Sequence, residues 1–314
     1  MIEIVAAGPL TTVQDLGRPG WRAFGMPVAG AADRQALVAA NLLAGNPPGA
    51  AALELTLQGG AFLFAEPAYA ALAGADLRAT LDGAPVRAWS AFPVRAGARL
   101  ALGAAVAGVR AYLGVRGGID VPPVLGSRST FARARVGGQE GRALRAGDRL
   151  PVGVTSGAPP AGPRALGPSA VPRYEGQLEL RVLPGPQDDA FTPRGSETLL
   201  GAEFRVTDRS DRMGWRLDGP AIELVGGADI VSDALLPGAV QVPGDGRPIV
   251  MGVDAPTVGG YAKIATVIGP DLARLAQARP GAVVRFRRVA EAEAVEALRR
   301  EREAWARLAA ALEA

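Results

Sequence analysis

The chain has 314 residues, enough for two domains of ordinary size, and its 48% hydrophobic and 21% charged residues are typical of a globular protein. A formal net charge of +3 is too small to indicate a nucleic-acid-binding surface, so we expect no nucleic-acid partner. The sequence contains no cysteine and no histidine, which excludes disulfides, thiol nucleophiles and histidine bases, and we expect no metal site.

The N-terminal residues and the lengths of the hydrophobic runs predict the subcellular localisation of the protein. Met1-Ile-Glu-Ile4 has no basic segment followed by a long apolar stretch, so it does not resemble a signal peptide. No run approaches the roughly 18 to 20 apolar residues of a membrane span. We therefore expect a soluble, cytoplasmic protein that does not bind a membrane.

Short strands dominate the first half of the chain. Apolar residues alternate with polar ones in several segments, as in half-buried strands. The predicted strands are Ile2–Val5, Leu53–Leu57, Leu77–Leu81 and Val109–Val115. One helix interrupts them, with Asp33 as its N-cap and Gly45 and Pro47 ending it.

A segment rich in proline, glycine and alanine divides the chain. We predict an N-terminal β subdomain with one inserted helix over 1–153, a linker over 154–175 and a second β subdomain over 176–289. The tail, 290–314, is predicted to be an amphipathic helix. Its expected apolar stripe is Val295, Leu298, Trp305, Leu308 and Leu312.

Lys263 is the single lysine of the chain, and all other basic residues are arginine. It follows Gly259-Gly260-Tyr261, where two glycines allow a close approach of the backbone to a ligand. A compact ammonium beside a tyrosine suits binding of a carboxylate or carbamate, or general acid catalysis. The alternative interpretation is a hairpin turn with solvated polar side chains.

Further candidate residues lie upstream. In Asp208–Arg216, an arginine near Trp215 suits fork-like recognition of a carboxylate, but the residues alone favour a surface loop with internal ion pairs. Gln241 adds a neutral amide between two prolines. The sequence has no Walker A motif and no dinucleotide-binding glycine motif, so no phosphate-binding loop is recognisable in this chain.

Ordered motifs along nearly the whole chain, from about Thr11 to Val289, resemble the second subunit of allophanate-hydrolase-like, biotin-dependent carboxyltransferases. This family includes the C subunit of 5-oxoprolinase, the regulatory protein KipA and half of the carboxyltransferase region of urea carboxylase. The motifs are Thr12–Arg18, Gly30–Arg34, Asn41–Asn46, Ala52–Thr56, Arg116–Ile119, Leu125–Phe131, Pro184–Gln187, Ser210–Gly214, Pro237–Pro243 and Gly259–Ile268.

The resemblance implies a mainly β fold with two cyclophilin-like β-barrel subdomains. The family's Gly-Gly-Tyr-Pro-Lys stretch falls on Gly259 to Lys263, and Ala262 departs from the usual proline, which we expect to loosen the turn. The resemblance indicates Lys263 and Tyr261 as catalytic residues. The implied substrate-binding residues are Asp211, Arg212, Gln241, Gly259 and Gly260, and we expect Asp211 to position Arg212.

Within this family the fold does not fix the function. The chain looks most like the C subunit of an ATP-dependent 5-oxoprolinase, with ATP handled by the complex. The implied partners are a protein like KipI or allophanate hydrolase subunit 1, and the LamB/YcsF-like A subunit of 5-oxoprolinase. The alternatives are the carboxyltransferase half of a biotin-dependent urea or amide carboxylase, and a non-catalytic regulator that binds a kinase inhibitor.

Overall fold

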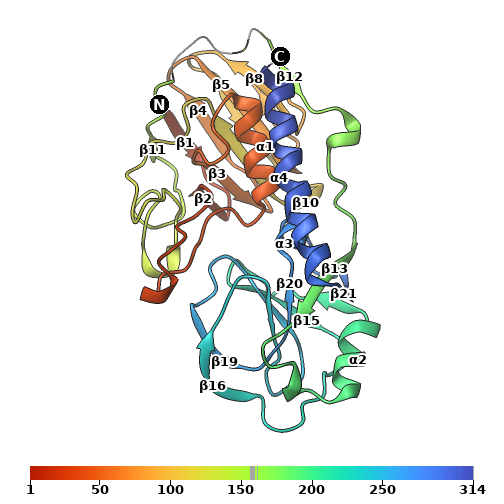
Figure 1. Ribbon diagram of the computed structural model, residues 1–314. Helices are drawn as coiled ribbons and strands as arrows, with labels where there is room; N and C mark the ends of the chain where they lie inside the picture. Colours follow the sequence, from red (N-terminus) through yellow and green to blue (C-terminus); the bar gives the residue numbers. More distant parts are fainter. Residues whose placement is uncertain (156–159, 161, 314) are drawn as a thin grey trace. The chain divides into compact units, whose positions relative to one another are not determined.

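Two compact units make up the computed structural model, which describes residues 1–155, 160 and 162–313 (Figure 1). Unit 1 contains residues 1–18, 29–174 and 304–314, and unit 2 contains residues 19–28 and 175–303. The predicted linker 154–175 lies partly outside the described residues. Its described part contains β12 (Arg164–Ala165) and the 3₁₀ helix η3 (Pro168–Ala170).

Unit 1 is built from two sheets that, over its described residues, have six strands each. The first has the order β11 (Arg149–Leu150), β1 (Ile2–Ala6), β4 (Ala61–Phe64), β9 (Arg99–Ala101), β6 (Thr80–Leu81), β7 (Ala84–Pro85). The second has the order β12, β8 (Ser90–Val94), β5 (Ala68–Asp76), β10 (Ala107–Val115), β3 (Ala52–Thr56), β2 (Leu10–Gln14).

The core of unit 1 explains the alternating pattern of its strands. Ile2 and Ile4 of β1 and Leu53 and Leu55 of β3 are fully buried in one apolar cluster that draws side chains from both sheets. Because side chains on a strand alternate between its two faces, this cluster fixes which face of each strand points inward.

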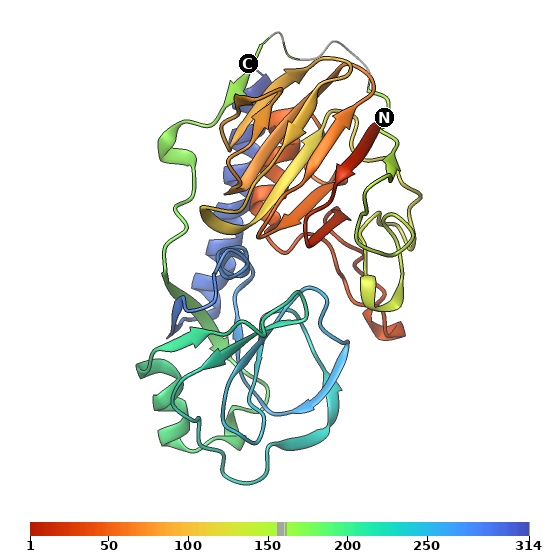
Figure 2. The same cartoon turned by 180° about the vertical axis from the view of Figure 1, so that it is seen from behind.

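Helix α1 (Arg34–Ala44) covers the other face of the second sheet, where it contacts β5, β8 and β10 (Figures 1 and 2). The predicted caps are confirmed. The Asp33 side chain accepts a hydrogen bond from the Ala36 N–H at 3.0 Å, and Gly45 ends the helix in the left-handed conformation.

Unit 2 is a barrel whose described strands close on themselves. Most neighbouring strands are antiparallel, but the closing pair, β13 and β21, is parallel. The order is β13 (Gln177–Pro184), β20 (Lys263–Val267), β17 (Ala239–Gln241), β18 (Ile249–Met251), β15 (Gly214–Asp218), β14 (Phe204–Val206), β21 (Val283–Arg288). The mainly β fold class is thereby confirmed.

Unit 2 also contains a two-stranded antiparallel ribbon, formed by β16 (Asp229–Ala234) and β19 (Val258–Tyr261). Short helices complete the unit: α2 (Pro193–Gly201), α3 (Gly269–Leu275) and the 3₁₀ helices η1 (Arg22–Phe24) and η4 (Asp188–Ala190). The remaining 3₁₀ helix, η2 (Ala132–Ala134), belongs to unit 1.

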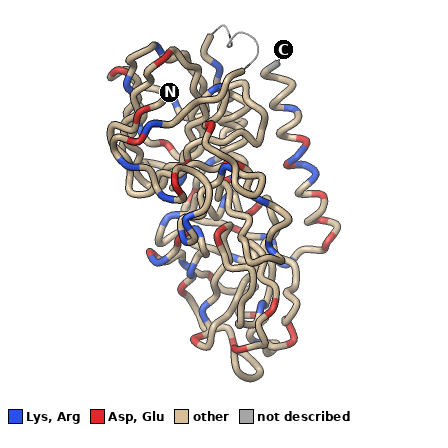
Figure 3. The backbone as a smooth tube through the Cα atoms, turned by 90° about the vertical axis from the view of Figure 1, so that its left-hand side faces the viewer, with Lys and Arg blue, Asp and Glu red and all other residues tan. Residues whose placement is uncertain are grey.

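The predicted C-terminal helix is confirmed as α4 (Glu291–Glu313), along which basic and acidic residues intersperse (Figure 3). Only part of its predicted apolar stripe is covered. Leu308 and Leu312 pack against the apolar cluster beneath α1, whereas Val295 and Leu298 remain 42% and 37% exposed. No helix in the described chain has the length and hydrophobicity needed to cross a membrane.

Two local predictions are wrong. The strand expected over Leu77–Leu81 is present only at Thr80–Leu81, because β5 ends at Asp76 and Arg78 adopts a left-handed conformation with φ 48°. The expected turn at Gly259-Gly260 is part of strand β19, and neither glycine has a positive φ.

Candidate functional site

Lys263 begins strand β20, and its side chain is only 3% exposed. Its ammonium donates to the Asp233 carboxylate of β16 at an Nζ–Oδ2 distance of 2.9 Å. The Asp233 side chain is 49% exposed. The lone lysine is therefore a buried cation, and the carboxylate paired with it faces solvent.

The Pro184–Gln187 motif wraps around the backbone of Lys263. The Gly185 N–H donates to the Ile264 carbonyl at 2.9 Å, and a Cβ on Gly185 would lie 2.0 Å from the Lys263 carbonyl oxygen. Only glycine fits so close an approach between two backbones. The Gln187 N–H also donates to the Lys263 carbonyl, at 3.4 Å.

The Gln187 side chain closes a ring with Lys263 and Asp233. Its Oε1 accepts from the Lys263 backbone N–H at 3.3 Å, while its Nε2 donates to Asp233 Oδ2 at 3.2 Å. The hydrogen bond from Lys263, followed by those from the Ala234 N–H and Gln187, lowers the pKa of Asp233 below its ordinary value of 3.8. Asp233 is therefore held as an anion against the ammonium.

Sequence reasoning missed both partners of Lys263. Gln187 had a usable signal, because it ends one of the motifs that carry the family resemblance. Asp233 had none, because it is one of two aspartates in the exposed strand β16 and belongs to no motif. The pairing of β16 with β19, in which Asp233 lies opposite Gly259, brings it to Lys263.

Strand β19 places the other predicted residues of the motif beside this ring. A Cβ on Gly259 would lie 2.6 Å from Gln241 Nε2, and that nitrogen donates to the Tyr261 carbonyl at 3.2 Å. Around Gly260 the nearest atoms to such a Cβ are 3.7 and 3.9 Å away. Tyr261 is 40% exposed. The structure thus brings Lys263, Gln241 and the Gly259–Tyr261 backbone together.

Ala262 does not loosen this segment as expected. It is fully buried, and its N–H donates to the Ala228 carbonyl at 3.1 Å. A proline has no N–H and could not form this bond. Alanine therefore ties the segment to the residue that precedes β16.

Arg212 is held by a different carboxylate from the one we expected. Its Nε and Nη2 donate to the two oxygens of Asp254 at 2.8 and 2.9 Å, and both side chains are nearly buried. The predicted partner, Asp211, instead accepts from the backbone N–H groups of Met213 and Gly214 at 2.7 and 3.2 Å. The Arg212–Asp254 pair joins two loops of unit 2, which favours a supporting role over direct contact with a ligand.

A second polar cluster lies buried in unit 1. Asp15 accepts from the Ser127 hydroxyl at 2.7 Å, the Arg128 N–H at 2.6 Å and the Ser129 hydroxyl. Arg18 donates to the Ser129 carbonyl. These bonds join the motifs Thr12–Arg18 and Leu125–Phe131, and because Ser127 and Ser129 are almost fully buried, the cluster favours a structural role.

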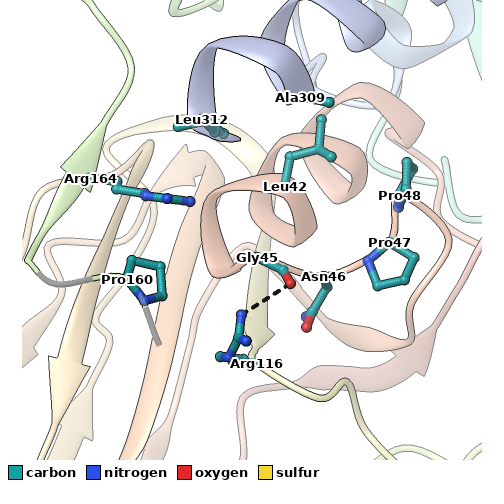
Figure 4. A pocket seen from close by; sticks show the side chains of 10 residues that line it. All are labelled: Leu42, Gly45, Asn46, Pro47, Pro48, Arg116, Pro160, Arg164, Ala309 and Leu312. Carbon is teal, nitrogen blue, oxygen red and sulfur yellow. Dashed lines mark hydrogen bonds between the residues drawn. The ribbon is translucent and has the colours of Figure 1, made fainter. Parts of the chain in front are cut away.

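A cavity of about 540 Å³ lies where α1 ends in unit 1 (Figure 4). Arg116 and Arg164 reach its wall, and Arg116 donates to the Gly45 carbonyl at 3.3 Å. Leu42, Ala309 and Leu312 form part of its apolar lining. Because a helix C-terminus carries partial negative charge, the arginine at Gly45 acts as a partner for α1.

The chemistry available at Lys263 is that of an anion site. The ring offers one ammonium and one amide, and β19 adds a tyrosine hydroxyl and a glycine-flanked backbone. Across the described residues, no group of three or more aspartates or glutamates is arranged to hold a metal ion. The arrangement suits binding of a carboxylate-like group and transfer of a proton to or from it.

Comparisons with known proteins agree with this architecture. Residues 24–288 match a family model described as carboxyltransferase domain, subdomain A and B. The chain is 40% identical over 297 residues to the 5-oxoprolinase C subunit of Escherichia coli, covering 95% of this chain and 94% of that protein. It is 38% identical to the 5-oxoprolinase C subunit of Haemophilus influenzae, covering 97% and 96%.

A solved structure extends the likeness to the fold. The crystal structure of the Kluyveromyces lactis urea amidolyase matches with a TM-score of 0.92 and 31% identity, over 98% of this chain and 20% of that one. The chain therefore belongs to the carboxyltransferase domain family, subdomain A and B.

Proposed function

We propose that this chain is the C subunit of an ATP-dependent 5-oxoprolinase, which hydrolyses 5-oxo-L-proline to L-glutamate together with partner proteins. The observation that carries the proposal is the match to two 5-oxoprolinase C subunits over 94% and 96% of their length. By contrast, the chain covers only 24% of a putative urea carboxylase from Emericella nidulans, at 35% identity.

In this proposal the ring around Lys263 handles the anionic substrate or a phosphorylated intermediate. The ammonium offsets negative charge, and the exposed Tyr261 side chain and the Gly260 backbone line the approach. Gln187 holds the backbone of Lys263 in place, and the Arg212–Asp254 pair fixes the neighbouring loops. ATP is assigned to the complex, because this chain has no recognisable phosphate-binding loop.

The test is reconstitution with candidate partners, a protein like KipI or allophanate hydrolase subunit 1 and a LamB/YcsF-like A subunit of 5-oxoprolinase. The complex should form L-glutamate from 5-oxo-L-proline when ATP is present. Lys263→Ala should lower that rate by roughly a hundredfold, the size of effect expected when a positioned electrostatic or acid–base group is removed. Arg209→Ala, at an exposed cation elsewhere in unit 2, is the matched control and should keep full activity. A fully active Lys263→Ala complex would refute the assignment.

A second function is favoured by a specific observation, the match to urea amidolyase and to the carboxyltransferase family model. In that case the chain is half of a carboxyltransferase that receives a carboxyl group from a separate biotin carrier. Purification of the native complex separates the two possibilities. Co-purifying biotinylated protein and biotin-dependent carboxylation support the carboxyltransferase, and oxoprolinase activity without biotin supports the first proposal.

A further inference from the structure

Lys263 is almost fully buried, although an anionic ligand has to reach its ammonium. The side chain is 3% exposed, whereas that of Asp233, whose carboxylate contacts the ammonium, is 49% exposed. Three donors converge on this carboxylate: Lys263 Nζ at 2.9 Å, Gln187 Nε2 at 3.2 Å and the Ala234 N–H at 2.7 Å. The anion position beside the lysine is therefore already taken by a side chain of the same chain.

The strand that supplies Asp233 is well placed to release it. Strand β16 is exposed along most of its length, and its Val231 is 92% exposed. Among the described strands it pairs only with β19, and the pairing shifts register between Asp229 and Asp233. Elements with few buried contacts open at lower free-energy cost than core strands do. The barrel strand β20, which carries Lys263, is held on both sides by β13 and β17.

We propose that Asp233 is an internal stand-in for the ligand: its carboxylate occupies the anion subsite of Lys263 until a carboxylate-bearing ligand displaces it. This inference rests on the proposed anion-binding role of Lys263 and deepens it. The displaced Asp233 leaves with the ribbon strand β16, while Lys263 Nζ and Gln187 Nε2 remain as donors for the ligand. The subsite therefore selects for a single planar carboxylate or carbamate, the group whose geometry Asp233 already satisfies.

The single lysine gives a direct measurement. In a recombinant protein of this sequence, a neutral acetylating reagent, N-hydroxysuccinimidyl acetate, has two amines to modify, the α-amine of Met1 and the side chain of Lys263. Mass spectrometry reports both, and Met1 serves as the internal reference. In the wild type Lys263 should react slowly relative to Met1.

Asp233→Asn removes the charge and keeps the shape, so Lys263 acetylation should rise roughly fivefold to tenfold, as expected when a charge-assisted hydrogen bond of a half-exposed group is weakened. Asp229→Asn is the matched control, with the same change on the same exposed strand, and should react like the wild type. Asp233→Glu keeps a carboxylate and should restore slow labelling. Thermal midpoints establish that each variant is folded, since unfolding alone would also expose Lys263.

Ligand binding supplies the second readout. Acetate and 5-oxo-L-proline should each raise the thermal midpoint. The concentration that gives the same rise should be at least about fivefold lower for Asp233→Asn than for the wild type, because the internal competitor is weakened. If Asp233→Asn does not fold, added sodium chloride should raise Lys263 labelling in the wild type, since salt screens a half-exposed ion pair.

Equal labelling of Asp233→Asn, Asp229→Asn and wild type overturns the proposal, and so does an Asp233→Asn protein that binds neither carboxylate. When salt is the readout, unchanged labelling of the wild type overturns it too. These measurements use the isolated full chain and no catalytic assay. Their failure is therefore distinguishable from failure of the oxoprolinase proposal, which depends on the activity of Lys263→Ala in the complex.

Discussion

At the scale of single residues, the two buried cations of the site are held in different ways. Arg212 is paired through both oxygens of a nearly buried carboxylate, Asp254, whereas Lys263 is paired with a carboxylate that faces solvent. A planar guanidinium matches the two oxygens of a carboxylate, and a compact ammonium can exchange one anion for another. This contrast makes Arg212 a support and Lys263 the candidate ligand-binding group.

The support predicted for Arg212 can be measured as stability. Asp254→Ala leaves the guanidinium without its bidentate partner, and removing one member of a buried pair costs about 3 kcal/mol or more in the free energy of unfolding. Asp211→Ala removes two hydrogen bonds to backbone N–H groups at an exposed position and should cost only about 1 kcal/mol. Urea denaturation gives both values. A larger loss for Asp211→Ala would show that Asp211, and not Asp254, fixes this loop.

The sequence predicted the lysine but not its partners, and the reason is physical. Composition and the glycine–tyrosine motif single out Lys263 because both are local features of the chain. Asp233 lies 30 positions away, and its place is determined by strand pairing across the ribbon. The expected Asp211–Arg212 link failed for the same reason, because the true partner comes from a loop that only the folded barrel brings near.

At the scale of elements, the sequence predicted those helices and strands that carry a local signal, such as a capping residue or an alternation of apolar and polar residues. The cap at Asp33 and the stop at Gly45 defined α1, and alternation defined β1 and β3. Backbone conformations set by tertiary packing were not predictable, as at Arg78, where the chain leaves the sheet before β6. A Gly-Gly pair favours a turn because glycine is common in turns, but here both residues lie in a strand, and Gly259 permits close packing against Gln241.

The two glycines of β19 should therefore respond differently to substitution. Gly259→Ala forces Gln241 Nε2 away from the Tyr261 carbonyl and should cost about 1 to 2 kcal/mol in the free energy of unfolding. Gly260→Ala meets only ordinary contacts and should change stability by less than about 0.5 kcal/mol.

The fold does not require a glycine at 260, so Gly260→Ala should leave the unfolding midpoint of the chain unchanged. In the proposed function the ligand approaches the Gly260 backbone, so the same change should lower the activity of the reconstituted complex. Wild-type activity in Gly260→Ala would show that no ligand approaches the backbone at this position. A Gly259→Ala protein as stable as the wild type would show that Gln241 is not held by this contact.

At the scale of the whole molecule, the N-terminal part of the chain and its C-terminal helix contribute to one apolar cluster. The apolar cluster beneath α1 contains residues from Ala31 to Leu166, and Leu308 and Leu312 of α4 pack against it. The amphipathic pattern of the tail predicted a docked helix, because an isolated helix is marginal in water. The pattern alone could not show which half of the apolar stripe packs against other elements, since Val295 and Leu308 are both apolar positions of the same predicted stripe.

The cluster beneath α1 therefore predicts an uneven sensitivity along α4. Leu308→Ala removes apolar contacts with a core formed by residues more than a hundred positions earlier and should lower the free energy of unfolding by about 1 to 2 kcal/mol, less than for a fully buried leucine. Leu298→Ala, on the same helix at 37% exposure, is the matched control and should change it by less than about 0.5 kcal/mol. Because alanine is a slightly better helix former than leucine, both variants gain the same small helical propensity, and a difference between their unfolding free energies measures docking alone. Equal changes in the two variants would show that Leu308 does not stabilise the cluster beneath α1.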